Sequence, residues 1–212
     1  STACLLQQRL DIHGCAAFDV QAVCTGFVYA LANANALIVS GQAERVLVIG
    51  AETLSRIIDW SDRGTCVLFG DGAGAVVVEA SDEPGILSSH LLSDGNLWEL
   101  LYIPAGGSGM ELTPDRFAEN MHKMRMNGKE IFKVAVRTLS EFATRALESN
   151  GYTIDDLDWF VPHQANYRII DAVAKKIGLT PEQRKALKEL ARSLSLQNPQ
   201  RLLTNPAYMN HA

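Results

Sequence analysis

The sequence predicts an α/β fold, and three observations support this class. Short apolar runs of strand length alternate with longer stretches in which apolar residues recur at helical spacing. Glycine-containing pairs stand at the ends of the helical stretches, where helices commonly stop. The 212 residues are 47% hydrophobic and 20% charged, a composition typical of a globular chain and not of a disordered one.

The first part of the chain predicts one helix among four strands. The helix spans residues 25–39, is rich in alanine, is expected to be buried, and ends at Ser40-Gly41. The second strand is expected to be covered on both faces, because its residues are continuously apolar and β-branched. The four strands are expected at 17–20, 45–49, 66–69 and 73–79.

The second part predicts two amphipathic helices that follow a looser segment. Residues 84–128 are rich in glycine and proline, which indicates an insertion or a substrate loop. A long helix is expected over 129–149, between Asn127-Gly128 and Asn150-Gly151, and a second one over 166–177. Residues 158–161 between them predict a strand that Pro162 interrupts.

The tail after Pro181 differs from the rest of the chain in pattern and in charge. Apolar residues at 187, 190, 191 and 194 follow helical spacing, and the residues from Leu202 onward are expected to be poorly ordered. Residues 181–212 hold five basic and two acidic side chains, a net charge of +3. The whole chain has 19 basic and 24 acidic side chains, so residues 1–180 carry 14 − 22 = −8.

Composition also excludes several classes of function. An acidic chain repels a phosphate backbone, so we expect no nucleic-acid partner. No apolar run approaches the roughly 20 residues of a membrane span, and the first residues do not resemble a signal peptide. The four cysteines include no CxxC pair, so we expect free thiols in a reducing cytosol and no structural zinc.

Cys24 is the first candidate for chemistry, because it lies between a predicted strand and a predicted helix. The positive end of a helix dipole stabilises a thiolate, and the same backbone N–H groups can hold an oxyanion. The alternative is a buried cysteine in a turn of small residues.

His163 is the second candidate, because it follows a predicted strand and Pro162 and precedes a helix. The ends of neighbouring strands meet at one edge of an α/β sheet, so this imidazole can reach a cysteine there and act as acid, base or hydrogen-bond donor. The alternative is a capping or exposed histidine. The other four histidines have no comparable setting and are expected to be structural or superficial: His13, His90, His122 and His211.

Two further patterns have ordinary explanations. The glycine-rich segment 69–74 is followed by a predicted strand and lacks the Lys-Ser/Thr of a P-loop, so it indicates a tight turn between strands. Asp71 is then expected to bond to the turn and not to a metal. Basic residues on the two long helices are either a solvated face or a docking patch for an acidic partner.

Four segments together resemble a known family. They are 17–27 (AFDVQAVCTGF), 62–65 (DRGT), 69–75 (FGDGAGA) and 158–166 (DWFVPHQAN). In this order they resemble β-ketoacyl-acyl carrier protein synthase III, the initiating condensing enzyme of type II fatty acid synthesis. The resemblance implies a thiolase-like layered αβαβα fold that is incomplete in both halves.

The resemblance also implies a role for several residues. Cys24 matches the nucleophile that takes an acyl group from acyl-CoA, and His163 matches the histidine that assists decarboxylation of malonyl-acyl carrier protein. The implied reaction is a decarboxylative Claisen condensation with no metal and no redox cofactor. Other matches are Asn166 and Gly128 for the pantetheine arm, Arg63 for the CoA nucleotide, Phe69, Leu101 and Met126 for the acyl pocket, and Lys133, Arg168 and Lys175 for carrier-protein docking.

The same resemblance implies how the chain is organised. It covers residues 1 to about 180, without the first strand–helix segment of the family. The implied parts are an incomplete thiolase-like half (1–80), a loop region that lines the substrate site (81–128), the start of a second half (129–180) and an atypical basic tail (181–212). A cytoplasmic homodimer with exposed apolar surface is expected.

The tail departs from the family pattern. The family has a His-Gly-Asn-Thr-Ser motif, and the matching stretch here, 190–195, reads LARSLS. This change indicates a replaced or frame-shifted C-terminus. Because members of a catalytic triad contribute unequally, acyl transfer to Cys24 is compatible with the missing Asn, whereas full condensation is not expected. The alternatives are a related condensing enzyme of polyketide-type synthesis, or a non-catalytic protein that binds the carrier protein or a paralogue.

Overall fold

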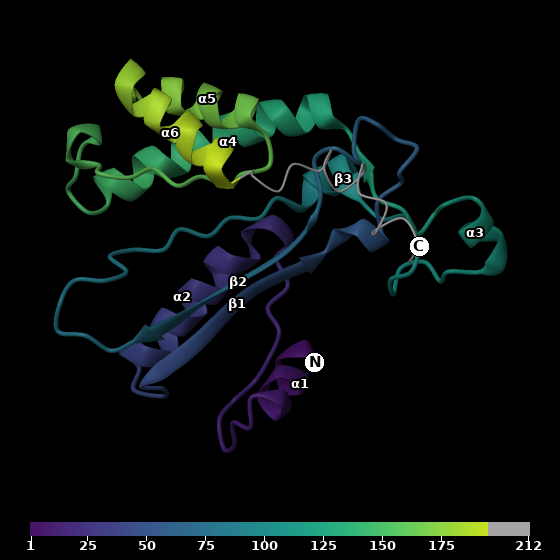
Figure 1. The fold of residues 1–212 in the computed structure, drawn as a ribbon, viewed down its shortest axis with the longest axis horizontal. Helices are drawn as coiled ribbons and strands as arrows, with labels where there is room; N and C mark the ends of the chain where they lie inside the picture. The colour runs from purple at the N-terminus through teal and green to yellow at the C-terminus, as the bar shows by residue number, and fades with distance from the viewer. Residues whose placement is uncertain (195–212) are drawn as a thin grey trace. The chain divides into compact units, whose positions relative to one another are not determined.

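The structure is a computed structural model that describes residues 1–194, with side chains up to residue 189. The chain forms two compact units (Figure 1). The first unit comprises residues 1–51 and 73–91, and the second comprises residues 52–72 and those from 92 onward. The segment from Leu202, expected to be poorly ordered, lies outside the described residues.

The first unit contains two helices and a two-stranded sheet. Their bounds are α1 Thr2–Arg9, η1 Val23–Thr25, α2 Gly26–Val39, β1 Arg45–Thr53 and β2 Asp71–Glu79, where η denotes a 3-10 helix. β1 and β2 pair, and the Ala80 N–H donates to the Glu44 carbonyl (3.2 Å) next to that pair. A Cβ built on Gly50 would lie 3.4 Å from Phe27 Cδ2, so the start of α2 packs closely on β1.

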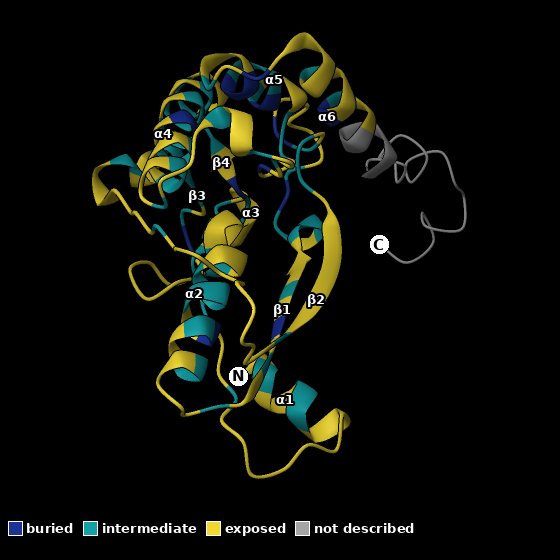
Figure 2. Ribbon diagram, turned by 90° about the vertical axis from the view of Figure 1, so that its left-hand side faces the viewer, coloured by how far each residue is buried: buried dark blue, intermediate teal, exposed yellow. Residues whose placement is uncertain are grey.

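The predicted helix at 25–39 and the strand at 45–49 are confirmed, but their expected burial is wrong. Ala34 is the only buried residue on α2, and Val48 is the only buried residue of β1. A two-stranded sheet with one helix beside it can bury little apolar surface, because its faces have few neighbouring elements. Figure 2 shows β2 almost entirely exposed.

The strands predicted at 17–20, 66–69 and 158–161 are wrong. Apolar character favours a strand, but a strand forms only where a neighbouring backbone completes its hydrogen bonds, and no described strand pairs with these segments. Their large side chains remain accessible: Phe18 is 52% exposed and Trp159 is 72% exposed. The glycine turn predicted at 69–74 is also displaced, since Asp71 to Gly74 lie within β2.

The second unit is mainly helical. Its elements are η2 Leu54–Arg56, η3 Gly95–Leu100, β3 Leu101–Tyr102, α3 Pro114–Ala118, β4 Arg125–Met126, α4 Gly128–Glu148, η4 Ile154–Asp156, α5 Tyr167–Lys176 and α6 Pro181–Leu194. The helices predicted before and after residue 158 are confirmed, as is the helical spacing after Pro181. The segment predicted as a loop, 84–128, contains four short elements, and β3 pairs with β4 in antiparallel fashion.

Local side-chain chemistry sets the ends of these helices. The side-chain oxygens of Asn127 and Asn166 accept hydrogen bonds from the first turns of α4 and α5. Gly151 (φ 74°) and Gly178 (φ 92°) follow the C-termini of the same helices in the left-handed region, which glycine occupies without strain.

The core of the second unit lies along α5. Helix α5 contacts both α4 and α6, and Figure 2 shows it between them with part of its surface buried. Ile170 and Ala174 of α5 form one apolar cluster with Leu179 and with Leu187 of α6, and Phe160 packs against its edge. This packing fixes the N-terminus of α5, where Asn166 and His163 lie.

Candidate active site

Cys24 is the middle residue of η1 and lies two positions before Gly26, the first residue of α2. Its thiol is free of any disulfide and its residue is exposed, so the alternative of a buried cysteine is wrong. The position at the start of a 14-residue helix is the one that the sequence predicted, although the strand expected before it is absent. An exposed sulfur at a helix N-terminus is placed for nucleophilic attack.

Val23, the residue before Cys24, has an unusual backbone conformation. Its φ of +49° lies in the left-handed region, which β-branched residues rarely adopt. Both the N–H and the hydroxyl of Thr25 donate to the Ala22 carbonyl, at 3.1 and 2.8 Å, and close this tight turn. The sequence did not predict this left-handed conformation, because valine favours an extended backbone. Such strain is found where the fold holds a functional residue in place.

His163 lies in the extended segment before α5 and belongs to the second unit, whereas Cys24 belongs to the first. His163 is exposed to solvent, which agrees with the alternative prediction of an exposed histidine. Surrounding protein nevertheless removes part of the ring from water and lowers the pKa of His163 below its usual 6.5. The imidazole is therefore neutral at pH 7 and can donate or accept a single proton. Asn166, and not His163, caps α5 (2.9 Å to the Arg168 N–H).

The other described histidines have ordinary contacts, as expected, and His211 lies outside the described residues. The contacts are His13 with Asp11 (2.9 Å), His90 with Ser88 (3.2 Å), and His122 stacked on Phe117 (4.1 Å between ring centroids).

Three of the residues expected around the substrate lie together in the second unit. Leu101 and Met126 are partners in the β3–β4 pair, and both are half-buried. Gly128 begins α4, and a Cβ there would lie 3.4 Å from Met126 Cε. Phe69, the other residue expected in the acyl pocket, is half-buried in the loop before β2.

Arg63 lies on an exposed turn that Asp62 organises. The Asp62 carboxylate accepts hydrogen bonds from the Gly64 N–H (2.9 Å) and from the hydroxyl of Thr65, which is only 1% exposed. The buried threonine anchors the turn and leaves the Arg63 side chain in solvent. An exposed guanidinium on a short anchored turn can reach a phosphate.

The three residues expected to dock the carrier protein lie on α4 and α5. Lys133 pairs with Glu130 (2.7 Å) and Lys175 pairs with Asp171 (2.6 Å), each within one helical turn, and Arg168 is exposed near the start of α5. Because each lysine has an acidic partner, the alternative of a solvated face remains compatible with the structure.

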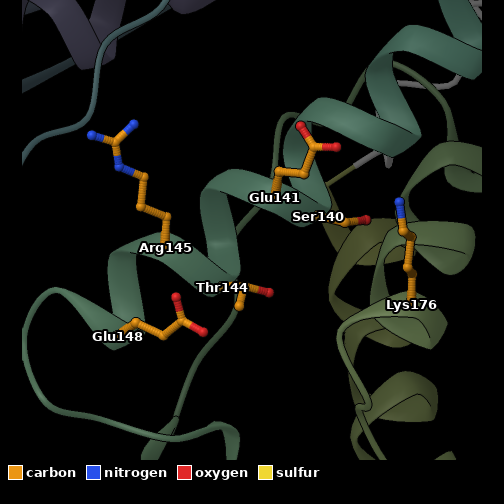
Figure 3. A pocket seen from close by; sticks show the side chains of 6 residues that line it. All are labelled: Ser140, Glu141, Thr144, Arg145, Glu148 and Lys176. Carbon is orange, nitrogen blue, oxygen red and sulfur yellow. The ribbon is translucent and has the colours of Figure 1, made fainter.

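A shallow groove of about 290 Å³ lies between α4 and the C-terminal end of α5 (Figure 3). Ser140, buried on α4, donates to the Val136 carbonyl (2.6 Å), so its hydroxyl serves the helix. Lys176 rises from α5 on the side of Ser140 and Glu141. None of the expected substrate residues lines this groove.

Two further observations bear on the kind of protein. Within the described residues, no group of three or more metal-ligating side chains is placed to hold an ion, and Asp71 instead accepts hydrogen bonds from the N–H and hydroxyl of Ser55 (2.8 and 2.7 Å). No helix within residues 1–194 combines the length and the apolar character that a membrane crossing requires.

The chain is similar to proteins of one family. A family model described as 3-oxoacyl-[acyl-carrier-protein (ACP)] synthase III matches residues 18–95, and the model of its C-terminal part matches residues 147–196, which include α6. A curated relative, the β-ketoacyl-[acyl-carrier-protein] synthase III of Methylococcus capsulatus, is 55% identical over 182 residues. That alignment covers 86% of this chain and 55% of the relative, so the chain spans about half the length of the relatives that it matches.

Solved structures agree with these sequence matches. The crystal structure of 3-oxoacyl-[acyl-carrier-protein] synthase III from Aquifex aeolicus is 46% identical, with a TM-score of 0.76, and the match covers 86% of this chain and 55% of that one. The priming β-ketosynthase of the R1128 polyketide biosynthetic pathway is 35% identical, with a TM-score of 0.70, over 84% of this chain and 52% of that one. The α/β fold class is therefore confirmed.

Proposed function

Because the chain belongs to the 3-oxoacyl-[acyl-carrier-protein] synthase III family, we propose that it performs the acyl-transfer chemistry of fatty acid biosynthesis through Cys24. The substrates are an acyl-CoA, with acetyl-CoA the first candidate, and malonyl-acyl carrier protein. The observation that carries this proposal is an exposed thiol at the start of α2, directly after the strained Val23.

The first step is transfer of the acyl group to sulfur. The Cys24 thiolate attacks the thioester carbonyl, and the tetrahedral intermediate places its negative oxygen near the backbone N–H groups at the start of α2. The bond from carbon to the CoA sulfur then breaks, and CoA leaves as a thiolate that takes up a proton. Thioester exchange between two sulfurs needs no net input of energy, so a positioned thiolate suffices.

The second step of the family's reaction is condensation, for which this chain offers His163 but no match to the Asn of the family motif at 190–195. The malonyl thioester loses CO₂, and the electron pair of the broken bond forms an enolate at the thioester. Its carbon attacks the acyl-Cys24 carbonyl, and the Cys24 sulfur leaves as a thiolate. The lowered pKa of His163 keeps its imidazole neutral at pH 7, so one ring N–H can donate a hydrogen bond to the enolate oxygen.

The remaining matched residues bind the substrates in this proposal. Asn166 and Gly128 contact the pantetheine arm, and Arg63 contacts the CoA nucleotide. The acyl chain lies against Phe69, Leu101 and Met126. The half-buried state of these three side chains supports this assignment. Lys133, Arg168 and Lys175 dock the acidic carrier protein from α4 and α5.

Mass spectrometry after incubation with acetyl-CoA tests the first step. We expect an acetyl group on Cys24 and none on Cys15, another exposed cysteine outside any disulfide, which serves as an internal control. The Cys24→Ser variant should lose the thioester adduct. A folded protein that acquires no acetyl group on Cys24 would rule out the catalytic role and favour the non-catalytic binding alternative.

Condensation is measured separately by adding malonyl-acyl carrier protein and following release of CO₂. The Asn of the family motif has no match in LARSLS at 190–195, so acetylation without CO₂ release is the result that we expect. The similarity to a priming β-ketosynthase favours one alternative, a condensing enzyme of polyketide-type synthesis. A panel of acyl-CoA chain lengths distinguishes the two, because a preference for chains longer than acetyl favours the polyketide alternative.

The same proposal includes a cytoplasmic homodimer. Val28 and Val39 of α2 are 48% and 79% exposed, and exposed apolar side chains along one helix support a contact with a second copy. Sedimentation velocity measures the mass in solution, and a monomer at all concentrations would contradict the dimer.

A further inference from the structure

A second groove, shallow and open to solvent, lies between α5 and α6 and has a volume of about 360 Å³. It lies wholly within the second unit and includes none of the residues proposed above except Lys175. Its volume falls in the range of sites for small molecules. The residues that line it are Tyr167, Asp171, Lys175, Pro181, Arg184, Lys185 and Lys188.

The groove is strongly cationic. Lys175 and Asp171 form an ion pair (2.6 Å) and largely cancel each other. Arg184, Lys185 and Lys188 remain, and no carboxylate among the described side chains forms an ion pair with any of them. Although Glu182 and Glu189 lie on the same helix, the three cations that line the groove stand within little more than one turn of α6 and repel one another, and a bound anion would relieve that repulsion.

Two features concern the positions of Lys188 and Arg184 at the groove. The Lys188 ammonium lies 5.5 Å from the centre of the Tyr167 ring, a cation–π contact that places it over α5. The Arg184 Nε is buried and has no hydrogen-bond partner within the described part of the chain. An N–H donor that is already withdrawn from water and unpartnered binds an anion at a smaller desolvation penalty than a hydrated one.

The start of α6 adds to the positive electrostatic potential at the groove. Thr180 and Gln183 cap the helix reciprocally, with hydrogen bonds of 2.8 and 3.2 Å, and Pro181 in its first turn lines the groove. The N-terminus of a helix carries partial positive charge, which favours anions.

We propose that the α5–α6 groove binds the phosphate groups of a phosphorylated small molecule, with a diphosphate as the smallest ligand. Arg184 supplies a planar fork of donors, and Lys185 and Lys188 supply two point charges, a combination suited to several phosphate oxygens. An acidic protein surface is a poorer fit, because stable protein interfaces bury about 800 Å² on each partner and the seven residues that line this groove form a much smaller surface. The proposal does not depend on Cys24 or on condensation.

Isothermal titration calorimetry of the full chain with pyrophosphate tests the proposal, with sulfate at equal ionic strength as the reference anion. Pyrophosphate should bind and sulfate should bind at least tenfold more weakly, since it carries fewer charges and oxygens. The Lys185→Gln/Lys188→Gln variant should weaken pyrophosphate binding by about tenfold or more. Its matched control is Lys129→Gln/Lys176→Gln, which makes the same charge change on α4 and on the other side of α5 and should bind as before.

A parallel titration with ADP separates the two sources of a diphosphate. Equal binding of ADP and pyrophosphate assigns recognition to the phosphates alone, and tighter binding of ADP assigns a further contact to Tyr167. Circular dichroism confirms that each variant is folded, and Arg184→Gln provides a second test should the lysine pair be unstable. The proposal is overturned if pyrophosphate does not bind, or if the two double variants lose the same amount of pyrophosphate affinity. It is also overturned if a polyglutamate peptide binds and pyrophosphate does not.

Discussion

Leu101 on β3 and Met126 on β4 are direct partners in an antiparallel pair. Opposite residues of such a pair point to the same face, so the two side chains meet although they are far apart in sequence. Gly128 follows at the start of α4 and leaves room beside Met126. Among the three residues expected to line the acyl pocket, Leu101 and Met126 are the two that lie opposite each other in a strand pair.

Leu101→Ala should destabilise the second unit by about 1–2 kcal/mol, because the side chain is half-buried and its removal leaves Met126 without its partner. Urea unfolding measures the change in free energy. Leu112→Ala, in an exposed loop position, is the matched control. It should change the free energy of unfolding by only about a few tenths of a kcal/mol. Equal effects of both substitutions would mean that the β3–β4 pair does not depend on this contact.

Ile170→Ala should cost about 2–4 kcal/mol, because Ile170 is 2% exposed and forms the centre of the α5–α6 cluster. Thermal and urea unfolding measure this loss. Ile169→Ala removes the same atoms from the half-buried neighbouring position and should cost clearly less. A reversed order would contradict the orientation of α5.

Thr65→Val keeps the shape of a buried side chain and removes its hydrogen bond to Asp62. We expect a loss of about 1–2 kcal/mol, because the hydroxyl is buried and the carboxylate loses a donor. Ser61→Ala removes a comparable hydroxyl, bonded to Asp59 at an exposed site, and should have a smaller effect. Hydrogen exchange of the Gly64 amide should rise in Thr65→Val alone.

The carboxylate of Asp19 should stabilise α1 in a pH-dependent way. It accepts hydrogen bonds from the Ala3 and Thr2 N–H groups (2.8 Å each), which lower the pKa of Asp19 below its usual 3.8. The stabilisation is therefore complete above pH 3.8 and is lost as the pH falls through the lowered pKa. Asp19→Ala should speed hydrogen exchange in α1 at neutral pH, and Asp82→Ala, an exposed aspartate with the same charge change, should not.

His163 should titrate below pH 6.5, because partial burial of the ring disfavours its charged form. The unfolded chain then binds more protons than the folded one between the lowered pKa and 6.5, so this group makes folding less favourable as the pH falls through that window. NMR titration of the ring C–H resonances measures the pKa, and His163→Gln assigns the signal and should reduce the acid sensitivity of unfolding. A midpoint at or above 6.5 would contradict the lowered pKa of His163.

Helices were predictable from the sequence because their signals are local. The apolar period and the flanking Asn127 and Asn166 located α4 and α5 within one or two residues, since caps and side-chain spacing act within a few residues of each other. The position of Cys24 at the start of α2 followed from the same kind of signal.

Strands were less predictable, because a strand depends on partners elsewhere in the chain. The apolar runs around Phe18 and Trp159 have strand-like composition, but no described neighbour pairs with them and their side chains are exposed. Conversely, β3 and β4 are only two residues each, and they form because the chain brings Leu101 and Met126 together.

The sequence by itself determined the family, the four longest helices and the identity of the candidate nucleophile and histidine, because these reside in short motifs of contiguous residues. Tertiary structure alone decided the left-handed Val23 before Cys24, the partial burial that lowers the pKa of His163, and the gathering of Arg184, Lys185 and Lys188 against Tyr167. Each of these depends on atoms brought close by chain folding, and distance in space is the quantity that a linear pattern does not encode.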